Sequence, residues 1–135
     1  MKKFAKITAV ALVAVLALAA LVACGPASDP KKAEKALKDN GYTVVAVVGA
    51  DGALVQAGLD IVAKAAGLEA GDITATVEAT KGSETISITY FASASAAKTF
   101  WDKNKDNITE KEGWVTKRSG SMIYTGTEQA VKDAR

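Results

Sequence analysis

The sequence predicts an α+β fold with one mostly antiparallel sheet, formed by the chain that follows the first 28 residues. Residues 73–80 and 85–90 alternate apolar with hydroxyl or charged side chains, which is typical of strands with one buried face. A second pair of β-prone runs, 114–118 and 122–126, flanks a Ser-Gly-Ser turn. Segments with helix-capping residues lie before, between and after these two pairs of strands. The sequence therefore predicts helices together with antiparallel hairpins in one fold.

The first part of this region predicts a helix, a strand and a second helix. Asp29 can cap a helix that has Pro30 at its first position and stops at Asn-Gly, residues 40–41. Residues 42–48 are an almost unbroken β-prone apolar run, which predicts a central strand covered on both faces. Residues 53–66 predict an Ala-rich helix. One face of that helix gathers Leu54, Ala57, Ile61, Val62 and Ala65.

The second part predicts two hairpins, each followed by a helix. Residues 81–83 turn the first hairpin, and Ser93 or Ser95 can cap a helix that runs to about Asn107. The second hairpin leads to Thr127, which we expect to cap a short final helix over 128–134.

The predicted order is therefore α-β-α-β-β-α-β-β-α. Its middle, residues 42–118, has the β-α-β-β-α-β order of the ferredoxin-like fold. We expect a ferredoxin-like core with an N-terminal helix and an added C-terminal strand and helix, in a single domain spanning 29–135.

The composition excludes several classes of catalytic, metal-binding and disulfide-linked site. The 135 residues include no His and one Cys. Without His, the chain has no Ser-His-Asp or Cys-His catalytic site and no His-ligated zinc. A lone Cys forms no internal disulfide. We therefore expect no enzyme activity and no cofactor.

The first 25 residues carry an export pattern. Lys2, Lys3 and Lys6 precede 15 consecutive apolar residues, 9–23. A spanning helix needs roughly 20 apolar residues, so this run is short for a membrane span and typical of a signal peptide. It ends in Leu21, Val22, Ala23, Cys24 and Gly25.

This ending resembles the lipobox of bacterial lipoproteins, with Leu21, Val22 and Ala23 before the sole Cys. The resemblance implies that Cys24 receives a diacylglycerol and that residues 1–23 are cleaved as a signal peptide. Residues 24–28 would then form a short tether to the domain. The resemblance also implies a lipid-anchored, extracytoplasmic location at the cell membrane or outer membrane.

Cleavage also changes the charge. Loss of three signal lysines from the 17 basic residues leaves 14 against 15 acidic residues. The mature chain is thus almost neutral, and we expect no nucleic-acid partner.

Aromatic residues supply the candidate contact patch. Phe91 is out of phase with the apolar positions of its strand, and Trp101 directly follows another aromatic residue on a helix. With Trp114 they form the candidate patch, because exposed aromatics are enriched at interfaces. The alternative for all three is core packing.

A calcium site is one alternative. Asp102, Asn104 and Asp106 have the spacing of the first half of an EF-hand loop. The sixth position is Asn107 instead of Gly, and the twelfth is Gly113 instead of the bidentate Glu. This pattern predicts weak calcium binding at most.

Two further alternatives rest on the first hairpin. Glu78 and Glu84 could face each other across it, as paired carboxylates do in glycosidases. Its hydroxyl-rich face could bind a glycan or another subunit. That face, extended to the second hairpin, carries Thr74, Thr76, Thr80, Thr85, Ser87, Thr89 and Thr116.

The sequence therefore favours a lipid-anchored, non-catalytic binding or interaction module. Its predicted partners are the membrane, through Cys24, and another envelope protein. A small-ligand or calcium-binding module is the alternative, and a carboxylate-dependent hydrolase is the third hypothesis. The mature part resembles, in general sequence character, many small bacterial lipoproteins of unknown function. That resemblance implies no activity.

Overall fold

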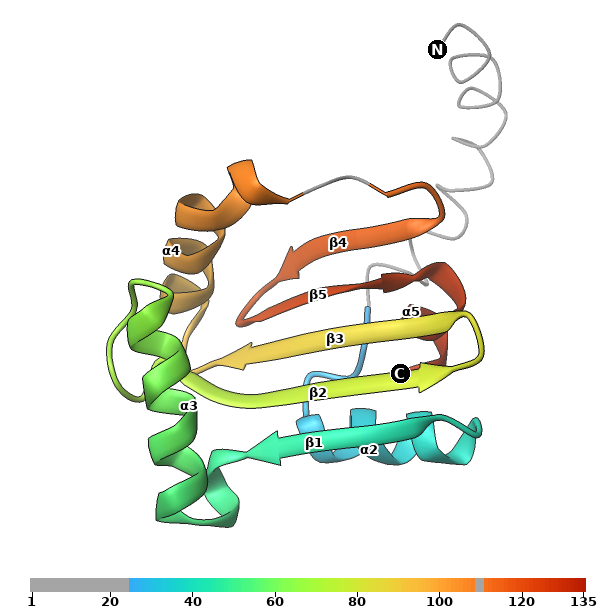
Figure 1. The fold of residues 1–135 in the computed structure, drawn as a ribbon, viewed down its shortest axis with the longest axis horizontal. Helices are drawn as coiled ribbons and strands as arrows, with labels where there is room; N and C mark the ends of the chain where they lie inside the picture. The colour runs from blue at the N-terminus through green and yellow to red at the C-terminus, as the bar shows by residue number, and fades with distance from the viewer. Residues whose placement is uncertain (1–24, 109–110) are drawn as a thin grey trace, which may run out of the picture.

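The computed structural model describes residues 25–108 and 111–135, which form an α+β fold with one open antiparallel sheet. The strand order is β1-β2-β3-β5-β4 (Figure 1). The strands are β1 Thr43–Val48, β2 Ile73–Lys81, β3 Glu84–Phe91, β4 Trp114–Ser119 and β5 Met122–Thr127. The α-helices are α2 Pro30–Asp39, α3 Ala53–Ala65, α4 Ala94–Asn104 and α5 Glu128–Asp133.

The sheet does not have the predicted ferredoxin-like arrangement. That arrangement needs a helical crossover between parallel strands. Here α3 joins two antiparallel neighbours, because Thr43 of β1 lies opposite Thr80 of β2 and Val48 lies opposite Ala75. The chain leaves β1 and enters β2 at the same end of the sheet, where α3 lies (Figure 1). β1 is consequently an edge strand, and the prediction of a central strand covered on both faces is wrong.

Helix starts follow the predicted caps in two of three cases. Asp29 accepts a hydrogen bond from the Lys31 backbone N–H at 2.9 Å, with Pro30 at the first helical position. Ser93, one of the two predicted candidates, accepts from the Ala96 N–H at 3.0 Å. Thr127 precedes α5, but its hydroxyl makes no capping bond.

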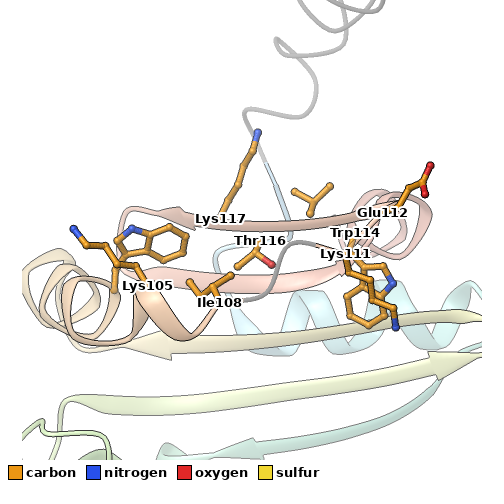
Figure 2. Close-up of a pocket in the computed structure, with 9 residues that line it drawn as sticks. Lys105, Ile108, Lys111, Glu112, Trp114, Thr116 and Lys117 are labelled. Atoms are coloured by element: carbon orange, nitrogen blue, oxygen red, sulfur yellow. The ribbon is translucent and has the colours of Figure 1, made fainter. Parts of the chain in front are cut away.

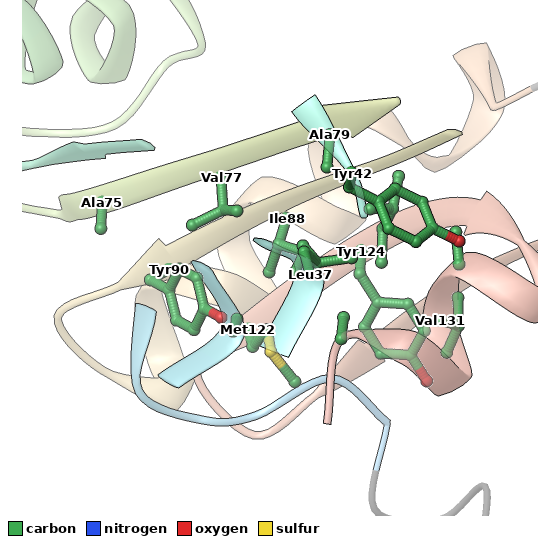
Figure 3. Packing of buried hydrophobic residues seen from close by; sticks show 14 of the residues in the cluster. Leu37, Tyr42, Ala75, Val77, Ala79, Ile88, Tyr90, Met122, Tyr124 and Val131 are labelled. Carbon is green, nitrogen blue, oxygen red and sulfur yellow. The ribbon is translucent and has the colours of Figure 1, made fainter. Parts of the chain in front are cut away.

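One face of the sheet packs against α2 and α5 and forms the larger core. Figure 3 shows Val77, Ile88 and Tyr124 of the sheet meeting Leu37 of α2 and Val131 of α5. All five are at most 2% exposed. This face follows the alternation that predicts the strands.

The predicted tether contributes to this core. Pro26 is fully buried, and the Ala27 N–H donates to the Ala134 carbonyl at 2.8 Å. The Tyr90 hydroxyl donates to the Ala27 carbonyl, also at 2.8 Å. Residues 25–28 therefore belong to the folded domain, while Cys24 and the lipobox residues Leu21, Val22 and Ala23 lie outside the described residues.

A second, smaller core lies at one end of the sheet, under α3 and α4 (Figure 1). Leu59 and Ala63 come from α3, and Ala97 comes from α4. They pack against Phe91 and Ile123, which lie on the face opposite to the larger core. The rest of that face has no helix packed on it within the described chain.

Candidate functional site

Two of the three predicted contact residues line one groove. Trp101 at the end of α4 and Trp114 at the start of β4 border an open groove of about 720 Å³ beside the edge strand β4 (Figure 2). Lys105, Lys111 and Lys117 also line it. The Lys111 ammonium lies 4.7 Å from the centre of the Trp114 ring, within cation–π range. The groove therefore combines apolar aromatic surface with positive charge.

Phe91 does not join this groove. It is 4% exposed, and its ring centroid lies 5.4 Å from that of Phe100 with the planes tilted by 50°. It ends β3 opposite Ile73, underneath α3 and α4. The core-packing alternative is the one that the structure shows for Phe91, and the contact patch loses this residue.

The acidic residues of the calcium-like pattern are not assembled as a loop. Asp102 and Asn104 belong to α4, and Asp106 lies in the 3₁₀ turn that follows. The Asp102 carboxylate accepts from Lys98 Nζ at 2.5 Å, and this bond holds the pKa of Asp102 below its usual value. The Asn104 amide donates to the Phe100 carbonyl. Across residues 25–108 and 111–135, no three His, Cys, Asp or Glu side chains come together as metal ligands.

The predicted carboxylate pair is also separated. Glu78 lies opposite Ser87 and Glu84 lies opposite Lys81, an offset of three positions that puts the two carboxylates on opposite faces of the sheet. Glu84 accepts a short hydrogen bond from the Thr127 hydroxyl. The two carboxylates therefore do not face one another.

The hydroxyl-rich face follows the predicted register. Thr76 lies opposite Thr89, Thr80 lies opposite Thr85, and Ser87 continues the pattern to Thr125 of β5. Thr116 of β4 hydrogen-bonds Thr125 at 2.7 Å between hydroxyl oxygens. These side chains form part of a partly exposed sheet face that runs from β1 to β4.

A second surface, which the sequence did not predict, lies on the edge strand β1 and on α3. The exposed large hydrophobic side chains of the described chain all belong to β1 and α3: Val45 at 62% exposure, Val47 at 36%, Leu54 at 90%, Ile61 at 70% and Val62 at 53%. We call these five residues the α3–β1 surface. The apolar helix face read from the sequence therefore points outward.

Polar side chains explain this orientation of α3. The Gln56 amide donates to the Ile73 carbonyl of β2 at 3.0 Å and to Asp60 at 2.8 Å. Asp60 also accepts from the Gly71 N–H at 2.7 Å, and these two bonds lower the pKa of Asp60. The side of α3 that carries Gln56, together with the buried Leu59 and Ala63, thus faces the sheet.

No protein-family model, curated protein or solved structure matches this chain. None of the helices within the described ranges has the length and apolar character of a membrane span. The groove borders β4 at one edge of the sheet, and Val45 and Val47 lie on β1 at the other edge, while α3 runs across the end of the strands to α4 (Figure 1).

Proposed function

We propose that this protein is a membrane-anchored lipoprotein of the cell envelope, and that it is a non-catalytic interaction module. Its partner is another envelope protein, which covers the α3–β1 surface. One observation carries this proposal: Leu54, Ile61 and Val62 expose more than half of their surface on one helix. Exposed hydrophobic side chains that gather at one place are typical of interaction sites.

The packing of the N-terminal segment supports an anchored module. The lipid would be attached to Cys24, one residue before the buried Gly25 and Pro26. A lipid at that position holds the domain against the bilayer without a flexible linker. A domain held in this way presents a fixed surface to its partner.

Site-specific photo-crosslinking in intact cells tests the interaction surface. A photoreactive amino acid at Ile61 should give a discrete crosslinked product, because this side chain is 70% exposed on the apolar helix face. The matched control is Lys98, an exposed position on α4. The same products from both positions, or no product from Ile61, would contradict the proposal. A product of twice the protein's mass would assign the surface to a second copy instead.

The mass of the intact protein tests the anchor. The protein purified from membranes should begin at Cys24 and carry the added mass of its lipid. A Cys24→Ser variant should keep the mass of the unprocessed chain. An unmodified chain that begins elsewhere would contradict the lipoprotein assignment.

A further inference from the structure

The described chain begins beside β5, the neighbour of the strand that borders the groove. Gly25 is buried against the ring of Tyr124 in β5, since a Cβ on Gly25 would lie 3.1 Å from ring atoms. Tyr124 lies directly opposite Lys117 of β4. Lys117 in turn lines the groove. Gly25 therefore lies one strand in from β4, on the face of the sheet that packs α2 and α5, whereas Trp114 and Thr116 of β4 point to the other face.

The groove has the chemistry of a membrane–water interface. Trp101 and Trp114 are half-buried, which exposes part of each amphipathic ring. Trp prefers the headgroup level of a bilayer for this reason. Lys105, Lys111 and Lys117 are exposed along this edge, and among the described residues that line the groove Glu112 is acidic. Lysines near a membrane attract anionic headgroups.

We infer that this edge faces the membrane and binds the headgroups of anionic phospholipids. We call Trp101, Lys105, Lys111, Trp114 and Lys117 the basic tryptophan edge. The inference rests on the proposed anchor at Cys24, which would bring this edge to the bilayer.

This orientation also separates the two surfaces. β4 would lie at the bilayer, and β1, which carries Val45 and Val47 of the α3–β1 surface, would lie at the opposite edge of the five-stranded sheet. The anchor and the basic tryptophan edge would then act together, because lipid chains supply attachment and the edge selects one orientation.

Tryptophan fluorescence tests the inference directly, because Trp101 and Trp114 are the only two tryptophans of the protein. The full lipidated protein is reconstituted into phosphatidylcholine vesicles with brominated acyl chains, with or without phosphatidylglycerol. We expect a blue-shifted emission and a quenching that is at least two-fold stronger with phosphatidylglycerol.

Charge variants supply the matched control. Removing the three lysines of the edge, in a Lys105→Gln, Lys111→Gln and Lys117→Gln variant, should abolish the response to phosphatidylglycerol. The same number of substitutions on α2, Lys32→Gln, Lys35→Gln and Lys38→Gln, should leave it unchanged. Circular dichroism of each variant verifies the fold.

Flotation of the vesicles separates failure of this inference from failure of the anchor. Protein that floats with both kinds of vesicle, but whose tryptophans are not quenched, would overturn the orientation and leave the anchor intact. Protein that floats with neither would overturn the anchor and this inference with it. A tryptophan response to soluble oligoglutamate, without one to phosphatidylglycerol, would assign the groove to an acidic protein segment and overturn the inference.

Discussion

Gly25 lies against the ring of Tyr124, so close that a Cβ would meet the ring Cε1 and the hydroxyl oxygen at 3.1 Å. Gly25 also has a φ of +52°, a conformation that L-residues with side chains rarely adopt. Both features restrict the side chain that this position can accept. They give the residue beside the proposed anchor a structural role of its own.

Substitution of Gly25 should therefore lower the unfolding free energy by more than the strain of its backbone conformation alone. Gly120 is the matched control, since its φ is +59° and nothing lies within 4 Å of an added Cβ. Gly120→Ala should lose about 1–2 kcal/mol of unfolding free energy, and Gly25→Ala should lose more because Tyr124 must shift. Urea denaturation of the two variants measures the difference. Equal losses would mean that the close contact with Tyr124 does not add to the cost of substituting Gly25.

The orientation of α3 predicts opposite results for two neighbouring residues. Leu59 is 3% exposed, and Leu59→Ala should cost about 2–5 kcal/mol. Ile61 is 70% exposed, and Ile61→Ala should change stability by no more than about 0.5 kcal/mol. Thermal unfolding distinguishes them. A large loss at Ile61 with little loss at Leu59 would mean that α3 buries its other face.

A buried glycine, Gly126, and an exposed glycine, Gly58, give a second pair of opposite predictions. A Cβ at Gly126 of β5 would lie 2.6 Å from the Thr85 carbonyl oxygen and 2.9 Å from the Ile86 Cα. Gly126→Ala should therefore push β5 away from β3 and cost about 1–3 kcal/mol. Gly58→Ala, on the open side of α3, should stabilise the protein by up to about 1 kcal/mol. Chemical denaturation measures both, and a harmless Gly126→Ala would contradict the close strand pairing.

The tyrosines predict an alkaline limit to stability. All three, Tyr42, Tyr90 and Tyr124, are at most 5% exposed, and burial raises the pKa of each hydroxyl. The Tyr42 hydroxyl also donates to the Asp133 carboxylate at 2.8 Å, which raises its pKa further. The folded pKa of each hydroxyl exceeds the unfolded value of about 10. The protonated hydroxyls therefore contribute fully to the stability of the fold below about pH 10. This contribution is lost as the pH rises above that value toward the folded pKa.

Tyrosinate absorbance and circular dichroism, followed together, check this prediction. Ionisation should occur only with unfolding, above about pH 10. Three tyrosines that ionise near their ordinary pKa while the dichroism of the fold stays unchanged would contradict it.

The periodicity of the sequence predicts most elements but not their pairing. The alternation over β2 and β3 identifies both strands, and their hydroxyl residues share one face as expected. The order of elements is compatible with more than one sheet, however. The place of β1 depends on whether α3 crosses the sheet or stays at its end, and no local pattern encodes that choice.

The residues of the candidate site could likewise be predicted from the sequence only in part. The periodicity places Leu54 and Ile61 on one helix face, but the hydrogen bonds of Gln56 and Asp60 to distant backbone groups turn that face outward. Trp101 and Trp114 are separated by residues 102–113, and the sequence does not specify how these bring the two side chains to one groove. Phe91 is out of phase with its own strand but meets α4, so burial there depends on tertiary packing.

The membrane contact of the basic tryptophan edge and that of the α3–β1 surface can be compared directly in the lipidated protein. Cys24 is the sole cysteine and the proposed lipid site, so an introduced cysteine would be the only free thiol for a nitroxide label. The label is placed at Ile108, beside the groove, or at Ile61, on the α3–β1 surface, of the lipidated protein in anionic vesicles. Power-saturation spectroscopy should show position 108 favouring lipid-soluble oxygen and position 61 favouring a water-soluble nickel chelate. Equal or reversed accessibility would contradict a module that holds its basic tryptophan edge at the membrane and its apolar surface away from it.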